Sequence, residues 1–195
     1  DSASALRQQV EWMQKALAFE TDLQTRAAMT VYLRRLYADY GKTDEAIATM
    51  ETYIREGSEI STYLRDRKDD ARMYVASQRA LLGDRSTLPE MDRLVKQKPQ
   101  NYNYAKDYAD ALAANGEYDQ AISLVARAQR IFLANRNRRA DFDLRMAEYY
   151  KAAGKVDSAL MYYQFCKDAG KELTPTDLQR MHHLSLLLHP EASRH

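Results

Sequence analysis

The sequence predicts an all-α protein built from consecutive helix hairpins, and three observations support this prediction. Apolar residues recur at helical spacing, most clearly at Ala105, Tyr108, Ala109 and Leu112. The 195 residues include only 6 Gly and 4 Pro, a content typical neither of a sheet with many turns nor of a disordered chain. A short pattern around a glycine also recurs along the chain, which indicates internal repeats.

The clearest unit runs from Tyr102 to Arg130 and reads as two helices joined by a tight turn at Asn115 and Gly116. Its second helix carries an apolar stripe made of Ala121, Leu124, Val125 and Ala128. A single hairpin of this kind leaves its outer faces unburied. The unit therefore predicts similar units on either side of it.

Two further copies of the turn support that prediction. Each has an aromatic residue or Leu four positions before the glycine, and Ala followed by Ile or Leu beginning five positions after it. The matched positions are Tyr37, Gly41, Ala46 and Ile47; Leu112, Gly116, Ala121 and Ile122; and Tyr150, Gly154, Ala159 and Leu160. A weaker copy turns at Gly83 and ends at Pro99.

This pattern resembles the tetratricopeptide repeat (TPR) family over residues 27–170. That family is known for stacked helix hairpins with a glycine turn, an alanine early in the second helix and a proline at the repeat end. The resemblance implies a right-handed α-α superhelix, a TPR-like solenoid of about ten helices without a β-sheet. It also implies one domain over residues 1–195, with an irregular N-terminal hairpin at 4–40 and a C-terminal capping helix at 175–189.

The helices follow from breakers and periodicity along the chain. No breaker interrupts the stretch from Ser58 to Leu82, which predicts one unusually long helix over 59–82. A short helix then ends near Gln97, before Pro99. The fourth repeat is predicted from helices near 138–153 and 156–169. The last helix begins at Thr174 and Pro175, because proline is well tolerated in a first helical turn.

Composition limits the class of protein. The formal net charge of +1 does not by itself indicate nucleic acid or a membrane surface. The single cysteine excludes an internal disulfide framework and a site of several thiolates. No apolar run reaches the roughly 18 residues of a membrane span. The repeats look like those of bacterial extracytoplasmic proteins, which favours that compartment over the cytoplasm.

The sequence predicts no catalytic, cofactor or metal site. His182 and His183 are adjacent, so on a helix they point about 100° apart and chelate poorly together. Cys166 matches the small residue Ala128 of the clearest unit, which favours a buried and inert thiol. The prediction is therefore a non-enzymatic scaffold that binds a protein or peptide, with an interaction or sensor module of a larger bacterial protein as a variant.

The resemblance implies where that partner binds. In TPR proteins the ligand lies in a concave groove lined by the first helices of the repeats. The matching side chains, with two tyrosines at the groove entrance, are Tyr32, Arg35, Tyr102, Asn103, Tyr104, Lys106, Asp110, Leu144, Glu148 and Lys151. As surface residues, Tyr104 and Lys106 should be replaceable by Ala and Glu with little change in stability.

An alternative function rests on a basic stretch. Five arginines follow one another without an intervening acid, namely Arg127, Arg130, Arg136, Arg138 and Arg139. Such a stretch is most often a solvated surface, and the alternative is a contact with an anion, an acidic peptide or a nucleic acid. Asp141 and Asp143 follow at once and partly neutralise it, so nucleic-acid binding is the less favoured reading.

Overall fold

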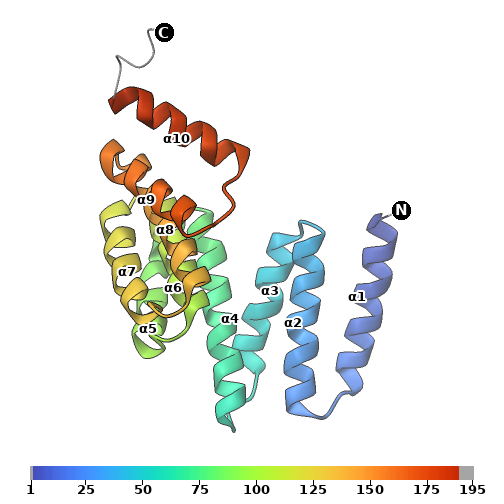
Figure 1. The fold of residues 1–195 in the computed structure, drawn as a ribbon. Coiled ribbons are helices and arrows are strands. Elements are labelled where there is room, and N and C mark those ends of the chain that lie inside the picture. The colour runs from blue at the N-terminus through green and yellow to red at the C-terminus, as the bar shows by residue number, and fades with distance from the viewer. Residues whose placement is uncertain (1, 189–195) are drawn as a thin grey trace. The chain divides into compact units, whose positions relative to one another are not determined.

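The computed structural model describes residues 2–188 and contains only helices there, which confirms the all-α prediction (Figure 1). This range contains ten α-helices and one 3-10 helix, joined by short loops, and no strand. Their bounds are α1 (Ser2–Phe19), α2 (Leu23–Asp39), α3 (Thr43–Glu56), α4 (Thr62–Leu81), η1 (Arg85–Thr87), α5 (Leu88–Gln97), α6 (Tyr102–Ala114), α7 (Tyr118–Ile131), α8 (Arg136–Ala152), α9 (Val156–Asp168) and α10 (Pro175–Leu188).

The helix predicted over 59–82 is α4, which has 20 residues and begins at Thr62. Its N-terminus is fixed by Ser61, whose side chain accepts a hydrogen bond from the Leu64 amide. The predicted capping helix is α10, and His189 at its expected end lies outside the described residues. None of the described helices is both long and apolar enough to cross a membrane.

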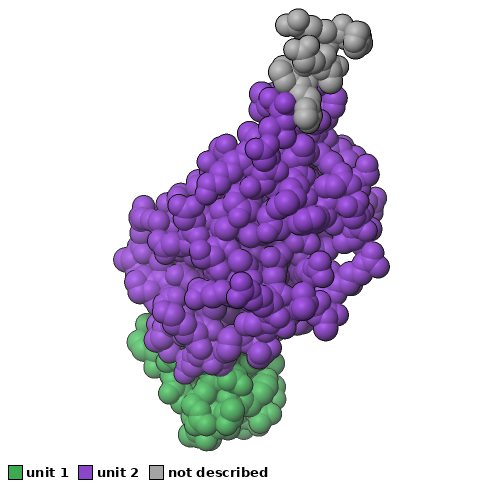
Figure 2. Space-filling model, turned by 60° about the vertical axis from the view of Figure 1, so that its left-hand side comes forward, with its two compact units in different colours: residues 1–82 green, residues 83–195 purple. Residues whose placement is uncertain are grey.

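The chain forms two compact units, residues 1–82 and residues 83–195 (Figure 2). Unit 1 contains α1 to α4, and unit 2 contains η1 and α5 to α10. Within each unit every α-helix packs against the next along the chain. In addition, α2 contacts α4 in unit 1, and α6 contacts α8 in unit 2. Contact between alternate helices is what stacked hairpins produce.

Three turns repeat the same geometry, as the glycine pattern predicted. Gly41, Gly116 and Gly154 have φ of 70°, 78° and 75°, a region that favours glycine. The amide after each glycine donates to the carbonyl of the residue four positions before the glycine, in the pairs Lys42–Tyr37 (2.8 Å), Glu117–Leu112 (2.9 Å) and Lys155–Tyr150 (2.8 Å). The three turns are therefore structurally equivalent, and positions counted from them can be compared.

The alanine five positions after each of these glycines lies at the centre of its hairpin. Ala46, Ala121 and Ala159 are all 0% exposed. A methyl side chain at this position lets the two helices of a hairpin approach closely. The core of unit 2 continues through larger side chains, including the fully buried Phe142 and Tyr163.

Candidate functional site

The residues that the sequence predicts to line the partner groove are called the predicted partner face. In unit 2 a polar contact between α6 and α8 lies on this face. Asp110 on α6 accepts hydrogen bonds from Arg145 Nε and Nη2, both at 2.9 Å, and from the Tyr149 hydroxyl at 2.7 Å. A bidentate arginine–carboxylate pair is among the stronger polar contacts in proteins. Burial, and then the neighbouring Asp110, raises the pKa of Tyr149. Asp110 therefore holds the first helices of two successive repeats together.

Glu148 on α8 makes a similar contact with the two helices that follow, α9 and α10. It accepts hydrogen bonds from Arg180 Nη1 of α10 at 2.9 Å and from the Tyr163 hydroxyl of α9. Lys151 Nζ lies 3.5 Å from its other oxygen. Glu148 thus also serves the stacking of helices within unit 2.

Tyr102 lies at the start of α6 and is half-buried. Its hydroxyl donates to Asp141 Oδ2 at 2.6 Å, and its ring packs edge-on against Phe132 and Phe142 with centroids 5.8 and 5.3 Å away. Burial, followed by the hydrogen bond to Asp141, raises the pKa of Tyr102 to about 12. The ring is therefore anchored inside unit 2.

The structure corrects the expected position of Tyr104. Its side chain is only 3% exposed, so it does not stand at the entrance of a surface groove. Tyr104 precedes Tyr108 by four residues and thus shares its buried side of α6. Because α6 contacts α5, α7 and α8, a wide arc of this helix is covered.

The remaining predicted residues lie at or near the surface. In unit 1, Tyr32 and Arg35 on α2 are exposed, Tyr32 by 54%. In unit 2, Asn103 is exposed, and Lys106 is half-buried with its Nζ 3.6 Å from Asp107. Leu144 packs partly against the cluster formed by α8, α9 and α10.

The arginine stretch divides between the end of α7 and the first turn of α8. All five arginines are exposed, and none forms an ion pair with a carboxylate of residues 2–188. Arg138 lies over the rings of Tyr102 and Phe132, 5.0 and 5.4 Å from their centroids. The positive charge of this stretch is therefore available at the surface.

Cys166 is fully buried, as the sequence predicted. Its thiol lies 3.7 Å from the Ala140 carbonyl oxygen, and burial raises its pKa to about 12. A thiol in this state is a poor nucleophile. Across residues 2–188 no group of three or more His, Cys, Asp or Glu side chains is placed to hold a metal ion.

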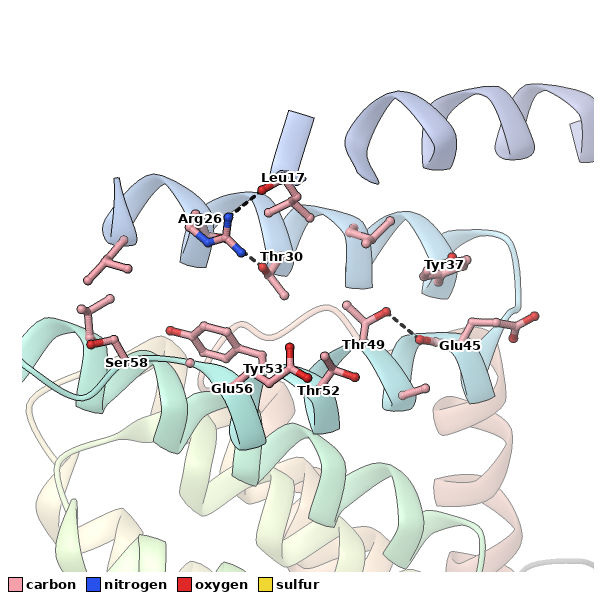
Figure 3. A pocket seen from close by; sticks show the side chains of 15 residues that line it. Leu17, Arg26, Thr30, Tyr37, Glu45, Thr49, Thr52, Tyr53, Glu56 and Ser58 are labelled. Atoms are coloured by element: carbon pink, nitrogen blue, oxygen red, sulfur yellow. Dashed lines mark hydrogen bonds between the residues drawn. The ribbon is translucent and has the colours of Figure 1, made fainter. Parts of the chain in front are cut away.

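Unit 1 contains a cavity of about 490 Å³ that the sequence analysis did not predict (Figure 3). It lies between α2 and α3, with Thr30 and Tyr37 on α2 across from Thr49 and Tyr53 on α3. Its size falls within the range of ligand pockets in proteins. Further apolar walls come from Leu17, Leu23, Leu33 and Leu64, and the carboxylates from Glu45 and Glu56.

Arg26 fixes the wall of this cavity at the turn between α1 and α2. Its Nη1 donates to the carbonyls of Leu17 at 2.6 Å and Glu20 at 2.7 Å. The end of α1 is thereby tied to α2 beside the cavity (Figure 3).

Tyr53 forms part of the cavity wall, and its hydroxyl is buried without a hydrogen-bond partner among the described residues. Burial raises its pKa. A side chain at Gly57 would meet this ring, because a Cβ there would lie 2.9 Å from Tyr53 Cε2 and 2.5 Å from the Tyr53 carbonyl oxygen. Glycine at position 57 therefore leaves room for Tyr53.

The comparisons with known proteins agree with the fold. The sequence matches no protein-family model and no curated protein. Among solved structures, MamA AMB-1 superposes with a TM-score of 0.61 at 15% identity, over 87% of this chain and 92% of that one. YrrB, described as a TPR protein with an unusual peptide-binding site, has a TM-score of 0.60 at 19% identity, over 96% and 84%. MamA MSR-1 has 0.57 at 17% identity, over 87% and 89%. The chain therefore has a TPR-like helical-repeat fold, as the glycine and alanine pattern indicated.

Proposed function

We propose that this protein is a non-enzymatic scaffold that binds a peptide segment of a protein partner. The observation that carries this proposal is the cavity in unit 1, which combines leucine and tyrosine walls with threonine hydroxyls and two carboxylates. A few polar groups in a mostly apolar concavity are typical of binding sites. The description of YrrB as peptide-binding supports the same class of ligand.

The predicted partner face remains a second place for contacts with the same partner. In unit 2 the side chains of Asn103, Lys106, Asp110, Glu148 and Lys151 are at least partly exposed, and in unit 1 those of Tyr32 and Arg35 are exposed. Asp110, Glu148 and Tyr102 would act there by keeping the helices of unit 2 in register, since each is bound to a neighbouring helix.

Filling the cavity should weaken peptide binding. Thr49→Leu places a larger apolar side chain into the space between α2 and α3, so we expect peptides selected from a displayed random library to bind at least ten-fold more weakly. Fluorescence polarisation with the selected peptides measures this. The melting temperature should stay level or rise, because cavity filling commonly stabilises proteins.

Thr62→Leu is the matched control, since Thr62 is an exposed threonine of α4 outside the cavity. It should bind the same peptides as tightly as the wild type. If Thr49→Leu also binds them unchanged, the cavity is not the peptide site.

The arginine stretch supports a second candidate function, which is binding of anions or nucleic acid. The observation in its favour is the lack of an ion pair for any of the five arginines within residues 2–188. Binding through such charges is strongly salt-dependent, because counterions are released from the phosphates.

Retention on heparin tests this candidate. If the stretch binds polyanions, replacing Arg136, Arg138 and Arg139 by Ala should move elution to clearly lower salt, while replacing the exposed Arg7 and Arg55 by Ala should have a smaller effect. Equal elution of the two variants would eliminate the arginine stretch as a polyanion site.

A further inference from the structure

The cavity of unit 1 occupies a place that large apolar side chains fill in unit 2. Because the turns at Gly41, Gly116 and Gly154 are equivalent, the residues eight positions later correspond to one another. These are Thr49 in unit 1, and Leu124 and Tyr162 in unit 2. Leu124 is 5% exposed, and Tyr162 stacks on Tyr150 with centroids 5.5 Å apart.

Thr49 does not fill this place. It is smaller than Leu or Tyr, and its hydroxyl donates to the Glu45 carbonyl of its own helix at 2.8 Å. The furrow beside Leu124 encloses about 280 Å³, against about 490 Å³ beside Thr49. Part of the additional space in unit 1 therefore has the position of a missing leucine or tyrosine side chain.

Position 53 differs from its counterparts in the opposite direction. Twelve residues after the glycine, unit 2 has the small buried residues Ala128 and Cys166, whereas unit 1 has Tyr53. The tyrosine ring enlarges the apolar wall of the cavity (Figure 3). An apolar group that entered would thus be covered by Tyr53 and by the leucines of α1 and α2.

The charges in the lining favour a cationic ligand. Glu45 forms no ion pair within the described part of the chain, and Glu56 pairs only with the exposed Arg55, at 3.2 Å. The lining arginine, Arg26, is held by two backbone carbonyls of the α1–α2 turn. Glu56 follows Glu45 by eleven positions along α3, which places their backbones about 16 Å apart.

We infer that the cavity takes a leucine-sized or aromatic side chain from a peptide segment that carries lysine or arginine on either side of it. The apolar side chain replaces the one that Thr49 lacks, and the basic residues lie near Glu45 and Glu56. In an extended peptide the 16 Å between the glutamates corresponds to about five residues. This inference rests on the proposed function, because it names the kind of peptide that the scaffold binds.

Selection with counter-selection tests the inference without a known partner. A random peptide library is panned against the full chain and depleted on Thr49→Leu. We expect the surviving peptides to combine Leu, Ile, Met or an aromatic residue with Lys or Arg within five positions. Survivors that are acidic, or that lack a large apolar residue, would overturn the inference and leave the peptide-binding proposal standing. If peptides bind but none depends on position 49, the inference fails and the cavity is not the peptide site; if the chain selects no peptide at all, the proposed function fails as well.

Defined peptides then separate the two parts of the inference. Lys-Ala-Leu-Ala-Ala-Lys should bind at least ten-fold more tightly than the peptide in which Ala replaces Leu, because burial of a leucine contributes substantially to affinity. It should also bind more tightly than the peptide with Glu in place of both Lys. Equal affinity of the Leu and Ala peptides would overturn the apolar part.

The double variant Glu45→Gln with Glu56→Gln tests the acidic rim. It should weaken binding of the lysine peptide about two- to ten-fold, as expected for two exposed ion pairs. Glu172→Gln, an exposed glutamate of unit 2, is the control and should have no effect. If the double variant also has no effect, the charge part of the inference is wrong.

A wild-type dimer that Thr49→Leu dissociates in sedimentation velocity would instead assign the cavity to a second copy of the chain.

Discussion

Tyr104→Ala is expected to destabilise the protein by about 3–5 kcal/mol, the typical cost of truncating a buried aromatic side chain. The side chain is 3% exposed and lies on the covered side of α6. Its loss leaves a cavity among α5, α6 and their neighbours, which packed helices fill only partly by moving. Chemical denaturation followed by circular dichroism measures the change as a shift of the unfolding midpoint.

Asn103→Ala is the control for this experiment, because Asn103 is the neighbouring residue of the same helix and is exposed. Its effect should stay within about 0.5 kcal/mol. A stable Tyr104→Ala variant, unfolding at the wild-type midpoint, would contradict the buried position of Tyr104 and restore the earlier expectation of a surface residue.

The architecture could be predicted from the sequence because it follows from short-range patterns. A glycine that must adopt positive φ, and an alanine that must fit between two helices, leave a signal within about ten residues. Gly41, Gly116 and Gly154, with Ala46, Ala121 and Ala159, carried that signal, and the structure confirms each of them. Such constraints depend little on the rest of the molecule.

The position of Tyr104 could not be predicted from the same pattern. A helix with neighbours on one side buries a narrow stripe, and the apolar spacing of Ala105, Tyr108 and Leu112 predicts such a stripe. In the structure α6 contacts three other α-helices, so its buried arc also includes Tyr104 and Ala111. The width of a buried arc depends on packing between repeats, which a single hairpin does not reveal.

The polar contacts across unit 2 were also beyond a local pattern. Asp110 and Arg145 are 35 residues apart, and each is an ordinary charged residue of an amphipathic helix. Only the stacking of α8 on α6 brings them together. Part of the predicted partner face is therefore used for internal contacts between these helices.

The cavity has a signal in the sequence. The three turns can be used to align the second helices of the repeats. Thr49 then corresponds to Leu124 and Tyr162, and Tyr53 corresponds to Ala128 and Cys166. In the first repeat, Thr49 is smaller than its two counterparts, and Tyr53, one helical turn later, is larger than its two counterparts. This exchange of sizes indicates that the helices of the first repeat pack differently from those of the others. Counting from the glycines would have identified α3 as the irregular second helix.

Ala121→Leu is expected to destabilise the protein by about 1–3 kcal/mol, because additional methylene groups in a well-packed core force side chains or backbone out of place. Ala121 is 0% exposed, and its equivalents Ala46 and Ala159 are alanines with the same burial. Leucine is more hydrophobic than alanine and also forms helices well. An argument from the single helix alone therefore predicts that Ala121→Leu leaves the free energy of unfolding nearly unchanged or raises it. Ala114→Leu provides that comparison, since Ala114 is exposed at the end of the same hairpin, and its midpoint should stay close to the wild type. Thermal and denaturant unfolding of the two variants side by side would decide the question: if Ala121→Leu is as stable as Ala114→Leu, the close approach of α6 and α7 does not depend on a small residue at this position.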